Sequence, residues 1–233
     1  MVVGHLREFC DRLVILDDGS DDGTTQWLRE NSDEQMIVEY RDHSTFYTHE
    51  GKCRGLLLDV VMEQRPEFVL SIDADEVVSD GAGLRARIES DPAQEVWSLT
   101  MLEAWNCDAQ YLSVRCDGGW RPHELSLVWR APQHGEKWRM LDRRLACRRV
   151  PMPVLAKTAK PSNVEVFHLG WLDKSTRRAR YDRYVTHDNG KYHASSHLRS
   201  IMFPDSRVKL QPRDWPAGAA FDHLRERFTS KPA

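Results

Sequence analysis

The chain has 233 residues, of which 40% are hydrophobic and 30% are charged, and its net charge is −3. These values are typical of a globular protein with a sizeable core, and they give no electrostatic reason to expect a polyanionic partner. No apolar run approaches the roughly 18 residues of a membrane span, and the amino terminus has no signal-peptide pattern. The five cysteines lack CxxC spacing, so we expect a reducing compartment, the cytoplasm, rather than a disulfide framework.

The first ninety residues alternate between predicted helices and predicted strands. The apolar spacing of residues 2–9 predicts a short helix, and LVILD at 13–17, apolar on both faces, predicts a buried strand. The patterns that follow predict a capped helix through 26–31, a strand at 36–40, an amphipathic helix at 50–63 and a strand that begins at Phe68 and ends in acidic residues. This alternation is typical of a parallel sheet with helices on its faces.

The second half of the chain has a different pattern, which predicts antiparallel strands and long loops. The β-rich stretches occupy residues 95–105, 109–115, 124–131 and 164–171, and a helical pattern occupies residues 174–187. The chain contains no internal repeat and no low-complexity linker. We therefore expect one domain.

Within this single domain of residues 1–233 we expect three parts. Residues 1–90 form a mostly parallel, Rossmann-like α/β half, and residues 91–190 form an antiparallel-rich half. Residues 191–233 form a carboxyl-terminal extension, which is rich in Pro, His and Arg. The pattern of this extension predicts no particular helix or strand.

Two acidic clusters follow predicted parallel strands. Asp17 and Asp18 come after the first strand, and Asp73, Asp75 and Glu76 end a later one. In open α/β sheets, ligands bind at the carboxyl ends of the strands. Strand alternation places both aspartates of an Asp-x-Asp on one side, where their charges repel unless a cation offsets them. The second cluster therefore predicts a hard oxygen site for Mn²⁺ or Mg²⁺.

The order and spacing of these clusters resemble a known family. LDDGSDDGT at residues 16–24, followed about fifty residues later by LSIDADE at 70–76, resembles the signature of family-2 glycosyltransferases with the GT-A fold. In that family DDGSxDGT is a nucleotide-recognition loop and DxD is the metal motif. The resemblance is strong over residues 11–80, and it implies a GT-A-like fold with a nucleotide-sugar-binding half at 1–90 and an acceptor-side half at 91–190.

The resemblance implies roles for the residues of both motifs. The loop residues near the base and ribose of a nucleoside-diphosphate-sugar donor would be Asp17, Asp18, Gly19 and Ser20. Asp73 would face the ribose or the sugar, and Asp75 would bind the metal that bridges the diphosphate. A UDP-sugar is the favoured donor. For Asp21 and Asp22 we favour a turn and helix-capping role instead.

Residues outside the motifs also match features of the family. Arg54, on the helix before the DxD strand, stands where the family often has an arginine near the nucleotide; the alternative is a solvated helix residue. His168 resembles a late histidine that completes metal or diphosphate binding; the alternative is a histidine satisfied by packing. On the next predicted helix, one of Arg177, Arg178 and Arg183 could reach the diphosphate.

An inverting transfer also needs a carboxylate that deprotonates the acceptor hydroxyl. Asp142 and Glu124 are the candidates, and Asp142 is slightly favoured, while a surface carboxylate is the alternative for either. Trp120, in a predicted loop, is a candidate platform for an acceptor sugar because sugar rings stack on indole faces. Core packing is the alternative for this tryptophan.

The resulting prediction is a metal-dependent glycosyltransferase that moves a sugar from a nucleoside-diphosphate donor to a hydroxyl group, by inversion. A saccharide is the favoured acceptor, and a lipid-linked glycan, a protein or a modified nucleic acid stay open. A nucleotidyltransferase is one alternative, although its glycine-rich phosphate loop is missing. A non-catalytic nucleotide-sugar-binding protein is the other. The family has a strand and a loop before the DDGS strand, whereas the twelve residues before Leu13 predict a helix, which favours the non-catalytic alternative.

Overall fold

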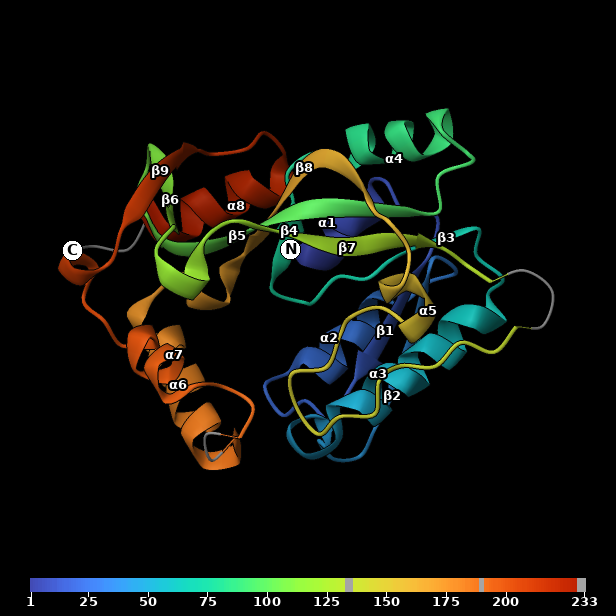
Figure 1. Ribbon diagram of the computed structural model, residues 1–233, viewed down its shortest axis with the longest axis horizontal. Helices are drawn as coiled ribbons and strands as arrows, with labels where there is room; N and C mark the ends of the chain where they lie inside the picture. Colours follow the sequence, from blue (N-terminus) through green and yellow to red (C-terminus); the bar gives the residue numbers. More distant parts are fainter. Residues whose placement is uncertain (133–135, 189–190, 230–233) are drawn as a thin grey trace.

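The computed structural model describes residues 1–132, 136–188 and 191–229 (Figure 1). The first part of the chain contains α1 (Val2–Arg7), β1 (Leu13–Asp17), α2 (Thr24–Asn31), β2 (Met36–Tyr40), α3 (Phe46–Glu63), β3 (Phe68–Leu70), β4 (Glu76–Val78) and α4 (Gly81–Ser90). The later part contains β5 (Val96–Cys107), β6 (Tyr111–Arg115), β7 (His123–Arg130), α5 (Met152–Leu155), β8 (Lys160–His168), α6 (Lys174–Asp188), α7 (Ser195–Ile201), β9 (Leu210–Asp214) and α8 (Ala219–Thr229). A 3-10 helical turn, η2 (Leu169–Trp171), joins β8 to the segment before α6.

The helices and strands predicted for the first ninety residues are found, with two differences. The strand predicted to run from Phe68 into the acidic residues is two short strands, because β3 ends at Leu70, residues 71–75 are not strand, and β4 begins at Glu76. The other difference is at the start of α3. That helix begins at Phe46, but His49 has a non-helical backbone and kinks it. Regular helix therefore runs from Glu50, which is the residue where the apolar spacing predicts the helix to begin. α1 precedes β1 in the chain, as the sequence predicts.

The described strands form two sheets. β1 and β2 make a parallel pair with Leu13 opposite Met36 and Asp17 opposite Tyr40. The larger sheet has the order β3-β7-β5-β6-β9, with β8 beside β5 and β4 beside β8. In this sheet the β5–β8 pair is parallel, and the other pairs of described strands are antiparallel.

The α/β class is confirmed, but the expectation of a mostly parallel sheet is wrong for the larger sheet. This expectation of parallel strands failed for a physical reason. A run that is apolar on both faces indicates a buried strand, yet it carries no information about the direction of the neighbouring strand. The chain turns between β3 and β4, and the two strands have different partners. β3 pairs antiparallel with β7, and β4 pairs antiparallel with β8.

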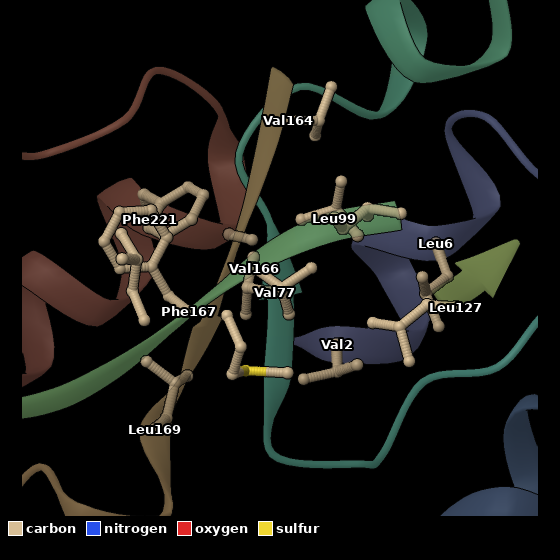
Figure 2. Close-up of a cluster of buried hydrophobic side chains, with 14 of the residues drawn as sticks. Val2, Leu6, Val77, Leu99, Leu127, Val164, Val166, Phe167, Leu169 and Phe221 are labelled. Atoms are coloured by element: carbon tan, nitrogen blue, oxygen red, sulfur yellow. The ribbon is translucent and has the colours of Figure 1, made fainter. Parts of the chain in front are cut away.

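The best-buried part of the core surrounds β5, which pairs with β6, β7 and β8. Leu99 and Leu102 of this strand are fully buried. Figure 2 shows Leu99 in one apolar cluster with Val166 and Phe167 of β8. Strands rich in β-branched and aromatic residues fill this layer, because such side chains pack well on a pleated surface.

The carboxyl-terminal extension is part of the same core. The ring of Phe221 on α8 packs edge-on against Phe167, with centroids 5.5 Å apart (Figure 2). β9 adds an antiparallel strand to β6. The sequence pattern did not predict these elements. The last residues of the predicted extension, 230–233, lie outside the described residues.

An open groove of about 1330 Å³ separates β1 from β3. We call it the β1–β3 groove. Consecutive residues line it along both strands, from Asp11 to Asp18 and from Gln64 to Ala74. A groove beside one face of a strand would meet alternate residues, so this groove runs along the strand edges. Among the described strands, β1 pairs only with β2 and β3 only with β7, which leaves one edge of each unpaired.

The described helices were also compared with the requirements of a membrane span. None of them combines sufficient length with a sufficiently apolar sequence to cross a bilayer.

Candidate functional site

The first motif forms a tight loop after β1 that its own aspartates hold in shape. The carboxylate of Asp17 is buried and accepts hydrogen bonds from the backbone N–H of Ser20, at 3.1 Å, and from the hydroxyl of Thr25. Burial alone would raise the pKa of Asp17, but these hydrogen bonds hold it below its ordinary value. Asp17 therefore carries a negative charge that stabilises the loop.

Asp18 joins the same loop to the start of α3. Its Oδ2 accepts hydrogen bonds from the backbone N–H groups of Thr45 and Phe46, both at 2.8 Å. Gly19 has a φ of +75°, and a Cβ there would lie 2.7 Å from the backbone of His43. Only glycine fits this left-handed, close-packed position without strain. The motif thus holds β1 and α3 in a fixed relation at the end of the β1–β3 groove.

The second motif is surrounded by arginines. The Asp73 carboxylate lies 3.3 Å from Nη1 of Arg54 and 3.4 Å from Nη2 of Arg149. Arg149 also pairs with Glu76, whose other carboxylate oxygen accepts the backbone N–H of Asp73. Burial alone would raise the pKa of Asp73, but Arg149 and Arg54 hold it below its ordinary value. Arg54 is largely buried, so the alternative of a solvated helix residue is wrong.

Asp75 and His168 come together where β4 pairs with β8. Oδ2 of Asp75 lies 3.3 Å from Nε2 of His168, and the guanidinium group of Arg180 pairs with the same oxygen. Asp75, Glu76 and His168 offer one ligand atom each within 4.8 Å of one another, so this cluster could hold a metal ion. The pairing of Glu76 with His168 across the two strands brings the histidine to the second motif.

Both motifs lie at one end of the β1–β3 groove. The residues that line it there are Asp17, Asp18, Ser20, Arg54, Asp73 and Arg149. Because β1 and β3 end at this point, the charged side chains of both motifs line the groove at the carboxyl ends of these strands. Charged side chains, among them Arg12, Arg65 and Glu67, also line it near the amino ends. Segments separated by more than fifty residues in the sequence thus build one concave site.

Known proteins were compared with the chain as a whole. No protein-family model matches it, and no curated protein is significantly similar to it. The resemblance to family-2 glycosyltransferases therefore depends on the two motifs and on the contacts of the residues around them.

The structure brings Glu103 into the site, although the sequence analysis did not select it. Glu103 extends from β5, and its Oε2 lies 2.7 Å from Nδ1 of His168. Burial alone would lower the pKa of His168, but Glu103 raises it above its ordinary value. A carboxylate on the far nitrogen of a metal-binding histidine orients the ring. A single charge inside the apolar run from Val96 to Trp105 was the signal that could have found it.

The arginines of α6 have different positions from those that the sequence suggested. Arg177 is buried and donates to backbone carbonyls of two tryptophans. Arg178 is exposed and pairs with an aspartate one turn along the helix. Arg183 donates to the hydroxyl of a tyrosine on α3. Arg180, three residues after Arg177 and on the same inward face, is the one that reaches the second motif.

The two candidate bases lie in different surroundings. The carboxylate of Glu124 on β7 accepts hydrogen bonds from the hydroxyls of Ser98 and Thr100 on β5, one on each oxygen. Asp142 is exposed. It lies on a segment that packs on α3, where the carbonyl of Arg143 accepts a backbone hydrogen bond from α3. The assignment of either residue as base stays a prediction.

The prediction that Trp120 is a sugar platform is wrong. Trp120 is only 3% exposed and lies between other aromatic rings. Its indole packs edge-on against Trp105 and Trp171 and stacks on His197, with centroids 4.8 Å apart in the stacked pair. A sugar platform needs an exposed ring face, and these neighbouring rings cover the indole of Trp120. Trp120, which the sequence places in a predicted loop, is here part of a second apolar cluster.

Proposed function

We propose that the protein is a divalent-metal-dependent glycosyltransferase that resembles family 2. It transfers a sugar from a nucleoside-diphosphate-sugar donor, with a UDP-sugar favoured, to a hydroxyl acceptor, with a saccharide favoured, by inversion. The observation that carries this proposal is the position of both motifs at the same end of the β1–β3 groove. A GT-A-like arrangement belongs to the proposal, and the parallel β1–β2 pair with α2 and α3 supports it.

Asp75 and His168 would hold the metal. A carboxylate oxygen and an imidazole nitrogen suit Mn²⁺, and a site richer in oxygen and water suits Mg²⁺. The pairing of Asp75 with a guanidinium group supports this assignment, since it indicates that the carboxylate takes a cationic partner. When bound, the metal would neutralise the charge that develops on the departing diphosphate.

The neighbouring residues would bind and orient the donor. Arg54 and Arg149 hold Asp73 ionised and fix its carboxylate at the groove wall, where it can accept hydrogen bonds from sugar or ribose hydroxyls. The carboxylate oxygens of Asp17 and Asp18 accept hydrogen bonds from the loop and from the start of α3. Their contribution to donor binding is therefore the shape of the groove end, rather than the direct contact that the motif implies.

The proposal is tested by nucleotide binding with and without metal. We expect UDP to raise the melting temperature of the wild type in the presence of Mn²⁺ and to have little effect in its absence. Asp75→Asn removes the metal-binding charge while keeping the size of the side chain, so the Mn²⁺-dependent shift is lost. Asp21→Asn is the matched control, because Asp21 is exposed on the first loop, and it keeps the full shift. A wild type that responds to no uridine or other nucleotide, or an Asp75→Asn variant that responds normally, contradicts the proposal.

A non-catalytic nucleotide-sugar-binding protein is the second candidate, and the β1–β3 groove favours it. The groove leaves an edge of β1 and an edge of β3 unpaired beside the donor site. Mn²⁺-dependent binding of a UDP-sugar without transfer to any saccharide and without hydrolysis would support this candidate over the transferase.

A further inference from the structure

Arg180 has the contacts of a cation that belongs to the second motif rather than to its own helix. It extends from α6, and its guanidinium group pairs with Oδ2 of Asp75. The same oxygen faces Nε2 of His168 at 3.3 Å. One carboxylate oxygen thus has two partners, an imidazole and a guanidinium group. A metal ion held by Asp75 and His168 would need this oxygen.

The surroundings of Arg180 leave room for its guanidinium group. A Cβ at Gly170 would lie 2.3 Å from Nη2 of Arg180 and 2.6 Å from Oδ2 of Asp75, so a side chain at position 170 would break this contact. The ring of Trp171 lies 4.8 Å from the guanidinium carbon. Within the part of the chain that the structure describes, Nε of Arg180 is buried and has no hydrogen-bond partner. A buried donor without a partner is costly, so an arrangement of Arg180 that pairs this group would be favoured.

The other arginines of the site have different partners. Arg54 and Arg149 pair with Asp73, Glu50 and Glu76. Of these three arginines, Arg180 is the one that pairs with Asp75. A divalent ion at Asp75 would repel a guanidinium group on the same oxygen, so the metal and Arg180 compete for Asp75.

We propose that Arg180 is an exchangeable cation. It pairs with Asp75 while no metal is bound, and it moves to the diphosphate of the donor when a divalent ion takes Asp75. This proposal rests on the proposed function. A planar guanidinium fork suits phosphate oxygens. Asp73, two residues before the partner of Arg180, lines the groove. Metal binding thereby frees a positive charge for the nucleotide.

The exchange predicts effects of opposite sign on two ligands. In Arg180→Gln, we expect Mn²⁺ alone to bind about fivefold more tightly, because an ion pair that competes for Asp75 is gone. In the same variant at saturating Mn²⁺, we expect UDP to bind about tenfold more weakly, because a charge-assisted hydrogen bond is lost. Titration calorimetry measures UDP, and the electron paramagnetic resonance signal of free Mn²⁺ measures the metal.

Two variants control for indirect effects. Arg178→Gln removes an exposed arginine of the same helix, paired with Asp182 at 2.9 Å, and it changes neither affinity. Arg180→Lys keeps a positive charge without the planar fork, and we expect near-normal Mn²⁺ affinity with weakened UDP binding. Thermal unfolding verifies that each variant is folded.

The possible outcomes separate the exchange from the proposed function. If Arg180→Gln binds Mn²⁺ less tightly than the wild type, or equally, the exchange is wrong, because an arginine that only holds the fold would weaken both ligands or neither. If Asp75→Asn still loses Mn²⁺ in that case, the proposed metal site stands without the exchange. If neither the wild type nor Arg180→Gln binds Mn²⁺, both proposals fail.

Discussion

β5 and β1 have similarly apolar sequences and very different surroundings. β5 pairs with three strands, and Leu99 in it is fully buried. Among the described strands, β1 pairs with β2 alone, and its central residues Val14, Ile15 and Leu16 remain partly exposed to the β1–β3 groove. An apolar sequence favours a strand, whereas the strands that pair with it determine how much of it is buried. Stability is concentrated around β5, and the candidate site lies at the less-buried β1 and β3.

The largest expected effect tests the β5 side of this comparison. Leu99→Ala leaves a cavity in a fully packed region, so we expect the free energy of unfolding to fall by about 3 kcal/mol. Ile15→Ala is the matched change on β1, and we expect it to cost about 1 kcal/mol because Ile15 is only partly buried. Urea unfolding followed by circular dichroism measures both. Equal losses would show that β1 is as well packed as β5, and would break the comparison.

The next effect concerns catalysis and is expected to leave stability unchanged. If Asp142 is the base, Asp142→Asn lowers kcat by about a hundredfold, because general-base catalysis is commonly worth at least that much. As an exposed residue it should change the free energy of unfolding by less than about 0.5 kcal/mol. Sugar transfer from a UDP-sugar measures the rate. Glu124→Gln is the competing variant, and a larger loss of kcat in it would assign the base to Glu124.

The smallest effect is a pH dependence at the end of β1. The folded pKa of Asp17 lies below its unfolded value, so its ionised form adds stability above the unfolded pKa, and this stability is lost as the pH falls through the lower folded pKa. We expect Asp17→Asn to cost about 1 kcal/mol at neutral pH. The difference from the wild type should shrink as the pH falls below about 4, near the unfolded pKa, and should disappear only below the folded pKa. Melting temperatures measured across this range test it, with Asp21→Asn as the control. A difference that persists in acid would show that the ionised carboxylate is not its source.

Local sequence determined much of the structure of residues 1–90. The strand before Asp17, the turn that requires Gly19 and the arrival of Asp75 after a strand could be predicted because each depends on neighbouring residues. The approach of His168 to Asp75 was expected from the family resemblance. The structure places their side chains 3.3 Å apart, through the pairing of β4 with β8.

The remaining features depend on contacts between distant segments. Which arginine of α6 faces Asp75 depends on the rotation of that helix, so the sequence could not separate Arg180 from Arg178. The antiparallel partners of β3 and β4 come from the second half of the chain, and no local pattern encodes them. Trp120 shows the same limit, because a local pattern that predicts a loop does not show what covers the ring.

The unpaired edge of β1 has a consequence for the chemistry of the groove wall. The backbone N–H of Leu13 donates to the carbonyl of Gln35 on the β2 side. Since successive backbone groups of a strand point in opposite directions within the plane of the sheet, the N–H groups of Val14 and Leu16 face the groove. Water has to satisfy them, because a backbone group left without a partner is costly. The groove thus has apolar side chains and a polar backbone rim, and a molecule that enters it between β1 and β3 must offer hydrogen-bond donors and acceptors of its own.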